Sequence, residues 1–163
     1  MITDATRISL YDYLATVFAS VTENLYSMTV PTENTKSDTE DGFIVTSVGN
    51  LVDESEFKGD AYGWARCQVT AFVPKRTRGR LNKTLYAAFE TAINDAIDAN
   101  TGLNNTGGYY IMEDSILSIE DNEDTQKGNQ YHVFAKSFVV VIDQQEVEEE
   151  EQQQEQELQS SNN

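Results

Sequence analysis

The stretch that decides the fold is GWARCQVTAFVPKRTRGRLNKTLYAAFETAINDAIDAN, residues 63–100. From Ala65 to Val73 apolar and polar residues largely alternate, which is the period of a half-buried strand. Pro74 ends that strand, because proline lacks the N–H that a central ladder needs. Apolar residues then recur at steps of three and four, which predicts an amphipathic helix from about Arg80 to the end of the stretch. The apolar face of this helix needs a sheet to cover.

A basic loop connects the predicted strand to the predicted helix. It contains Lys75, Arg76, Arg78 and Arg80, four of the 11 basic residues in a chain whose formal net charge is −17. A planar guanidinium suits paired hydrogen bonds to a carboxylate, so we expect the loop to meet carboxylates on an adjacent subunit or another protein. Two alternatives stay open: contact with passing DNA, and a solvated turn whose charges have no partner.

Composition fits one folded domain followed by a tail. The chain has 163 residues, 39% of them hydrophobic, which is enough to bury a sizeable core. We place the domain at residues 1–143. Residues 144–163 hold seven glutamates and no lysine or arginine, so we expect a disordered Glu/Gln-rich tail, with a docking strip for a basic partner as the alternative. The longest apolar run, Phe138–Ile142, is too short for a membrane span, so we expect no membrane contact and synthesis in a cytoplasm.

The remaining pattern predicts an α+β fold. Helical spacing of Leu10, Leu14 and Phe18 indicates a helix near the N-terminus, on the same sheet as the second helix. The polar residues 32–41 are interpreted as an exposed loop. Strands are expected at Asn24–Val30, Phe43–Val48 and Ala65–Val73, then from Tyr109 continuing through Ile116 to Ile119, and at Tyr131–Asp143. The expected architecture is two helices packed on one face of a mainly antiparallel sheet of about five strands.

No motif for catalysis or metal binding is present. Cys67, the single cysteine, lies on the apolar side of the predicted strand and is interpreted as a small buried hydrophobe. His132, the single histidine, has no nucleophile pattern nearby. The acidic loop from Asp121 to Asp124 lacks the alternating ligands and central glycine of an EF-hand. We therefore expect no catalytic residue, no metal and no cofactor, and a protein that is not an enzyme.

Four aromatic residues form the second group of candidate site residues. Tyr62, Trp64, Tyr109 and Tyr110 flank predicted strand starts rather than helix faces. Ordinary packing against the sheet explains them most simply. The alternative is a protein interface, because tyrosine and tryptophan bury a large area while keeping a polar group available.

Taken together, residues 1–143 resemble the tail terminator (tail completion, or neck) proteins of long-tailed bacteriophages. The resemblance rests on a short N-terminal helix, a strand ended by proline, a hairpin, the segment Trp64–Val73 leading into a helix, and a closing hairpin that ends in Phe138–Asp143. It implies a virion protein of the neck whose subunits form a ring, commonly six-fold. Such a ring terminates the tail tube and meets the head connector, so tail tube and connector proteins are the implied partners. The Glu/Gln-rich tail is not part of the usual pattern of this family.

A different class of function would use the acidic charge directly. A DNA mimic that blocks a nuclease or restriction enzyme needs a strongly negative surface, which a net charge of −17 supplies. The basic loop at residues 75–80 contributes nothing to such mimicry. Another cytoplasmic protein-binding module is the remaining alternative.

Overall fold

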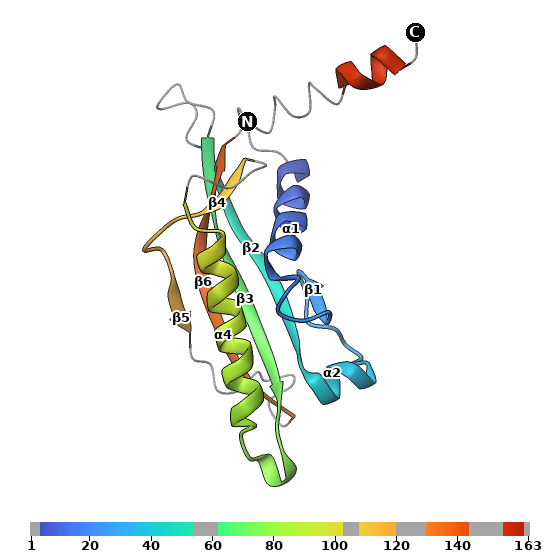
Figure 1. Ribbon diagram of the computed structural model, residues 1–163, viewed down its shortest axis with the longest axis vertical. Helices are drawn as coiled ribbons and strands as arrows, with labels where there is room; N and C mark the ends of the chain where they lie inside the picture. The colour runs from blue at the N-terminus through green and yellow to red at the C-terminus, as the bar shows by residue number, and fades with distance from the viewer. Residues whose placement is uncertain (1–3, 54–61, 103–107, 120–129, 144–154, 162–163) are drawn as a thin grey trace.

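A computed structural model describes residues 4–53, 62–102, 108–119, 130–143 and 155–161. It confirms the α+β class, and its sheet is open and has six strands rather than about five (Figure 1). The elements are α1 (Asp4–Phe18), β1 (Leu25–Ser27), α2 (Lys36–Asp41), β2 (Phe43–Asp53), β3 (Tyr62–Pro74), η1 (Thr77–Gly79), α4 (Lys83–Ala99), β4 (Tyr109–Ile111), β5 (Leu117–Ile119) and β6 (Tyr131–Asp143).

The sheet runs in the order β1-β2-β3-β6-β4, and β5 also pairs with β6. Only β1 and β2 are parallel; the other pairs of strands are antiparallel. The strand expected to continue from Tyr109 to Ile119 is instead divided into β4 and β5. Asp114 takes a positive φ of 63°, and the Ser115 N–H donates to the Met112 carbonyl at 3.3 Å, so a turn interrupts the strand.

The main core lies between one face of the sheet and two helices. Figure 1 shows α1 and α4 on the same side of the sheet. The apolar side of β3, from Ala65 through Cys67 to Val73, is buried against them, as alternation predicts. Full burial of one large side chain stabilises the fold by about 1.5–3 kcal/mol. The helices contribute Leu10, Leu14, Val17, Phe18, Phe89, Ile93, Ala96 and Ile97 to this cluster.

Helix α4 begins later than its apolar spacing predicts. Asn82 caps it, because its side-chain oxygen accepts a hydrogen bond from the Leu85 N–H at 3.2 Å. Arg80 therefore belongs to the preceding turn, and Leu81 lies outside the helix with 38% of its surface exposed. At the other end, Gly102 has a φ of 93°, the left-handed conformation that a residue just past a helix often takes.

The prediction of an exposed loop over residues 32–41 is wrong, because this segment contains α2. Thr35 and Asp38 form a capping box, in which each side chain accepts from the other's backbone N–H. Asp38 is fully buried, and the Tyr26 hydroxyl donates to its Oδ2 at 2.6 Å. This hydrogen bond is the main reason that the pKa of Tyr26 is raised. Nearby, on the sheet face away from α1 and α4, lies a smaller apolar cluster of Phe43, Val45, Phe72, Tyr131 and Val133.

Strand β2 extends five residues beyond the predicted end at Val48. Its register with β3 shifts between Val48 and Leu51, where a β-bulge places one extra residue in β2. Helix α1 binds the backbone at this point: the Arg7 guanidinium donates to the Val48 carbonyl at 3.0 Å, and the Val48 N–H donates to the Tyr11 hydroxyl at 3.1 Å. Ile44 and Thr46 turn their backbone groups toward β1, and Val48 follows them on the same edge of β2, beyond the end of β1. These side chains therefore satisfy ladder groups that β1 does not reach.

Residues 155–161 are helical and exposed, so the structure does not confirm the expected disorder of the tail. Glutamate and glutamine have good helix propensity, which explains how so polar a segment can be helical. Residues 144–154 and 162–163 lie outside the described residues. None of the helices in the described ranges combines the length and the apolar character needed to cross a membrane.

Candidate protein interface

Lys75, Arg76, Arg78 and Arg80, here called the basic tip, form a closed turn after β3. The Lys75 N–H donates to the Gln130 carbonyl at 2.9 Å, which fixes the start of the turn against the residue before β6. The Arg76 N–H then donates to the Arg80 carbonyl at 2.8 Å. Arg78 has a φ of 63°, and Gly79 follows with a φ of 71°, so the chain reverses here. The backbone thus presents the three arginine side chains outward.

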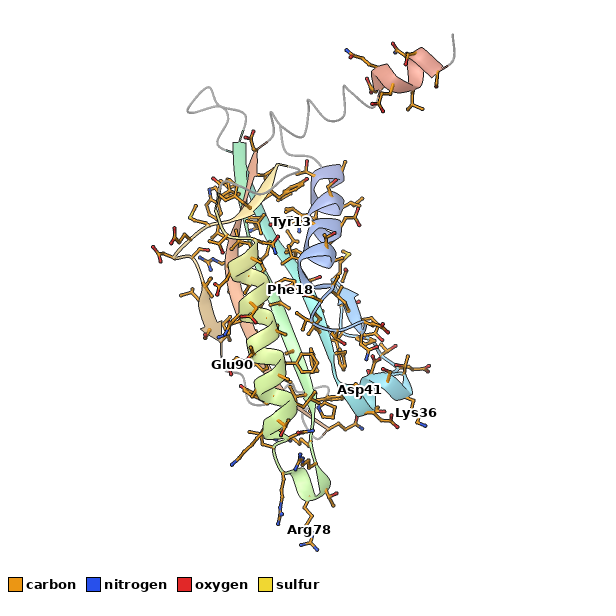
Figure 2. The ribbon with its side chains drawn as sticks, viewed as in Figure 1. Tyr13, Phe18, Lys36, Asp41, Arg78 and Glu90 are labelled. Carbon is orange, nitrogen blue, oxygen red and sulfur yellow. The ribbon has the colours of Figure 1, made fainter. Side chains whose placement is uncertain are left out.

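The arginines of the basic tip are exposed. Figure 2 shows Arg78 at one extreme end of the molecule, pointing away from the sheet. Arg76 makes a long contact to the Asn82 side-chain oxygen, at 3.4 Å. Within the described chain, neither Arg78 nor Arg80 has a side-chain hydrogen bond or ion pair. Both guanidinium groups are therefore available to a carboxylate or phosphate on another molecule.

The position of the basic tip is electrostatically unfavourable within a single molecule. It directly precedes the N-terminus of α4, where the helix dipole is positive, and the first turn of α4 has no acidic residue. A like charge at a helix end costs about 0.3–1 kcal/mol. The positive end of the helix and the arginines therefore form a single positively charged surface.

The aromatic candidates are far from the basic tip and are divided between the two faces of the sheet. Trp64 and Tyr110 are half-buried and both lie beside Val141 on the face without α1 and α4. Tyr109 is buried on the helix side, with its ring centroid 5.2 Å from that of Tyr13, so it packs in the core. The side chain of Tyr62 lies outside what the structure describes. About 35 Å of strand separates Trp64 from the basic tip.

A second surface, which the sequence analysis missed, lies at the edge of the sheet. Its apolar residues Met112, Ile116, Leu117 and Ile119 are 43%, 37%, 57% and 40% exposed, and we call them the β5 surface. They are four of the eight exposed large apolar side chains in the described chain, so half of these side chains lie in one short segment. Strand β5 pairs with β6 on one side, and no strand among the described residues pairs with its other side. Exposed apolar residues at an unpaired strand edge mark an interaction site.

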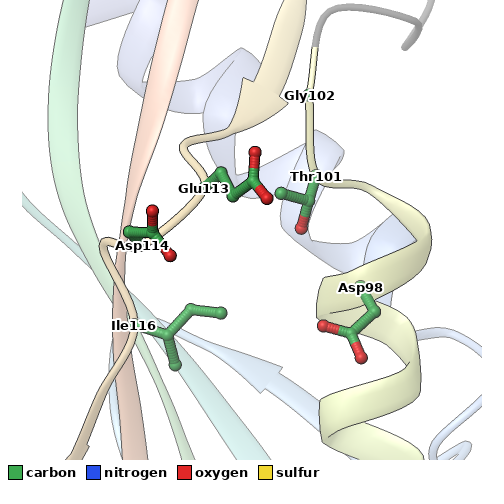
Figure 3. Close-up of a pocket in the computed structure, with 6 residues that line it drawn as sticks. All are labelled: Asp98, Thr101, Gly102, Glu113, Asp114 and Ile116. Carbon is green, nitrogen blue, oxygen red and sulfur yellow. The ribbon is translucent and has the colours of Figure 1, made fainter.

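An acidic cleft of about 660 Å³ adjoins the β5 surface (Figure 3). Asp98, in the last turn of α4, and Thr101, just past the helix, face Glu113 and Ile116 across it. Asp98 lies in the last turn of α4, where the helix dipole is negative and no basic residue is present. No ion pair within the described chain involves the carboxylates of Asp98, Glu113 or Asp114. No sequence signal connects these residues, because they come from two segments that meet only in the fold.

The structure gives the other polar candidates no chemistry. Burial raises the pKa of the Cys67 thiol to about 12, so the thiol stays protonated and is a poor nucleophile. His132 is half-buried in β6. Within the described ranges, no three His, Cys, Asp or Glu side chains are grouped so that they could hold a metal ion. The loop from Asp121 to Asp124 lies outside the described residues.

The chain matches no protein-family model. A search of curated proteins likewise finds no match. The basic tip, the β5 surface and the acidic cleft are therefore the starting point for a functional proposal.

Proposed function

We propose that this chain is a structural subunit of a bacteriophage neck. Its copies form a ring, commonly six-fold in the family that the chain resembles, which terminates the tail tube and joins it to the head connector. The observation that carries the proposal is the β5 surface, where Leu117 and Ile119 are exposed at an unpaired strand edge. Residues of this kind become buried when subunits assemble. The order of helices and strands, which resembles that of tail terminator proteins, supports a neck ring over other kinds of assembly.

A ring needs two different surfaces on each subunit. A contact between unlike surfaces repeats from one copy to the next and closes when the rotation between copies completes a circle. The basic tip and the β5 surface are unlike, and each copy carries both. The net charge of −17 also suits a lumen through which DNA passes, because an acidic wall repels phosphate and does not retain the DNA. The role is structural rather than enzymatic.

The alternative of a DNA mimic is less well supported. A mimic must present negative charge to a site that binds DNA. Here the exposed arginines at positions 76, 78 and 80 place positive charge at one end of the molecule. The exposed leucine and isoleucines of the β5 surface have no role in imitating phosphates. Both features fit a protein that binds other proteins.

Electron microscopy of the purified protein, alone and mixed with tail tubes, tests the proposal. The unmodified protein is expected to form rings or to cap the tubes. Combining Leu117→Lys with Ile119→Lys should abolish both, because each lysine places a charge on the surface that assembly buries. Ile8→Lys is the matched control, since Ile8 is 65% exposed but lies on α1. If the unmodified protein neither forms rings nor binds tubes at any concentration, the neck proposal is wrong.

A further inference from the structure

We infer that the basic tip of one subunit docks into the acidic cleft beside β5 of the next copy of this chain. The inference rests on the proposed function, because it names the surfaces that join neighbouring subunits in the ring. The joint is head-to-tail: every copy contributes its tip to one neighbour and its cleft to the other.

Charge complementarity identifies a second copy as the occupant of the cleft. In the described chain, Arg78 and Arg80 have no side-chain partner, and the cleft carboxylates Asp98, Glu113 and Asp114 have no ion pair. The two charged groups lie at opposite ends of α4, and each has the sign that the helix dipole disfavours at its end. A joint between copies brings each group to its opposite charge and removes both unfavourable arrangements.

Apolar residues accompany the charges on both sides. Leu81, immediately after the basic tip, is 38% exposed. Ile116 forms part of the cleft wall and is 37% exposed. Docking of the tip therefore buries Leu81 against Ile116 while arginines meet carboxylates. A cleft of about 660 Å³ is of the size that takes a drug-sized ligand, enough for several side chains.

The joint cannot form within one molecule. Helix α4 has 17 residues, so its two ends, and with them the tip and the cleft, are about 25 Å apart. Figure 1 shows η1, the tip segment, at one end of the long axis of the molecule, with the C-terminal end of α4 directed toward the other end. The tip and the cleft are therefore free to bind two different neighbours.

Two charge-reversed variants of the full chain test the joint. The tip variant combines Arg78→Glu with Arg80→Glu, and the cleft variant combines Asp98→Arg with Glu113→Arg. All four residues are exposed, so both variants should keep the urea midpoint and circular dichroism of the unmodified protein. The matched control combines Glu40→Arg with Asp41→Arg, which makes the same charge change as the cleft variant on exposed residues of α2.

Sedimentation and electron microscopy provide the readout, at protein and salt concentrations where the unmodified chain assembles. Each reversed variant alone should remain monomeric, because its altered surface carries the same charge as the surface it would meet. An equal mixture of the two should assemble again. The unmodified tip of the cleft variant fits the unmodified cleft of the tip variant, and the reversed tip fits the reversed cleft. The restored assemblies should hold both variants in a one-to-one ratio by native mass spectrometry, and the control should assemble normally.

The outcomes separate the joint from the ring. If either variant alone forms rings like those of the unmodified protein, the joint is refuted and the ring proposal stands. If both fail alone and their mixture also fails, the joint is again refuted, because complementary charges did not restore it. Open filaments that depend on the tip and cleft would support the joint and refute the ring. An unmodified protein that stays monomeric at every concentration and also ignores tail tubes refutes both proposals.

Discussion

Gly42 connects α2 to β2, and its replacement by alanine should strongly destabilise the fold. Its φ of 80° and ψ of 177° lie in a region that is essentially restricted to glycine and costs other residues about 1–3 kcal/mol. An added Cβ would also lie 2.7 Å from the Phe72 carbonyl oxygen and 2.9 Å from the Phe89 ring. Overpacking of this kind costs a further 1–3 kcal/mol or so. We expect Gly42→Ala to lower the free energy of unfolding by about 4 kcal/mol.

Alanine substitutions at two other glycines measure separately the cost of the backbone conformation and the cost of steric crowding. Gly79 has a φ of 71° but no atom within 4 Å of an added Cβ, so Gly79→Ala should cost only the conformational part, about 1–2 kcal/mol. Gly49 has no left-handed φ, but its added Cβ would lie 2.8 Å from the Arg66 carbonyl oxygen. Gly49→Ala should therefore cost only the crowding part, about 1–3 kcal/mol.

Urea unfolding followed by circular dichroism measures all three variants. The slope of the free energy against urea should be unchanged, since the same surface is exposed on unfolding. In a thermal scan, Gly42→Ala should lower the Tm by about 8–16 °C for a domain of this size. If Gly42→Ala is no more destabilising than Gly79→Ala, or costs less than about 1 kcal/mol, crowding at Gly42 is not a major cost.

Two further predictions concern buried titratable groups. Asp38→Ala should lower the free energy of unfolding by about 2–4 kcal/mol, because the Tyr26 hydroxyl and the Thr35 N–H lose their acceptor. It should also return the pKa of Tyr26 toward its ordinary value in an ultraviolet titration. An unchanged Tyr26 titration would contradict the structure. For Cys67 the pKa of about 12 in the folded protein exceeds the ordinary 9.0, so unfolding between these pH values releases a proton from the thiol. The free energy of unfolding should therefore fall as pH rises through this range, by up to about 1.4 kcal/mol per pH unit. Cys67→Ala should remove this contribution, and a slope unaffected by the substitution would show that other groups cause it.

Long periodic segments could be predicted from the sequence, and short or irregular ones could not. Strand β3 and α4 carry sustained periods of two and 3.6, so their types and buried faces followed from spacing alone. Helix α2 was missed because Lys36–Asp41 is polar throughout and buries an aspartate rather than an apolar residue. Its capping box was the one local signal, and it uses aspartate where glutamate or glutamine is usual.

The two halves of the candidate interface differ in the same way. The basic tip is contiguous in sequence and follows a proline, so its position in a turn was predictable. The acidic cleft combines Asp98 with Glu113, which lie on separate segments, and only the packing of α4 beside the β4–β5 connection brings them together. Exposure of Leu117 and Ile119 was equally hidden, because alternation indicates which residues share a face but not whether that face is covered.

The bulge in β2 makes this strand unusually tolerant of a change in length. Elsewhere in β2, loss of one residue would move every later side chain to the opposite face of the sheet. At the bulge, Val48 and Leu51 pair with Cys67 and Ala65, so three steps along β2 match two steps along β3. Deleting Asn50 would produce a regular ladder and leave Leu51 on the helix side. A chain that lacks one residue at this point should therefore keep the same core, with Arg7 and Tyr11 still attaching α1 to the Val48 backbone.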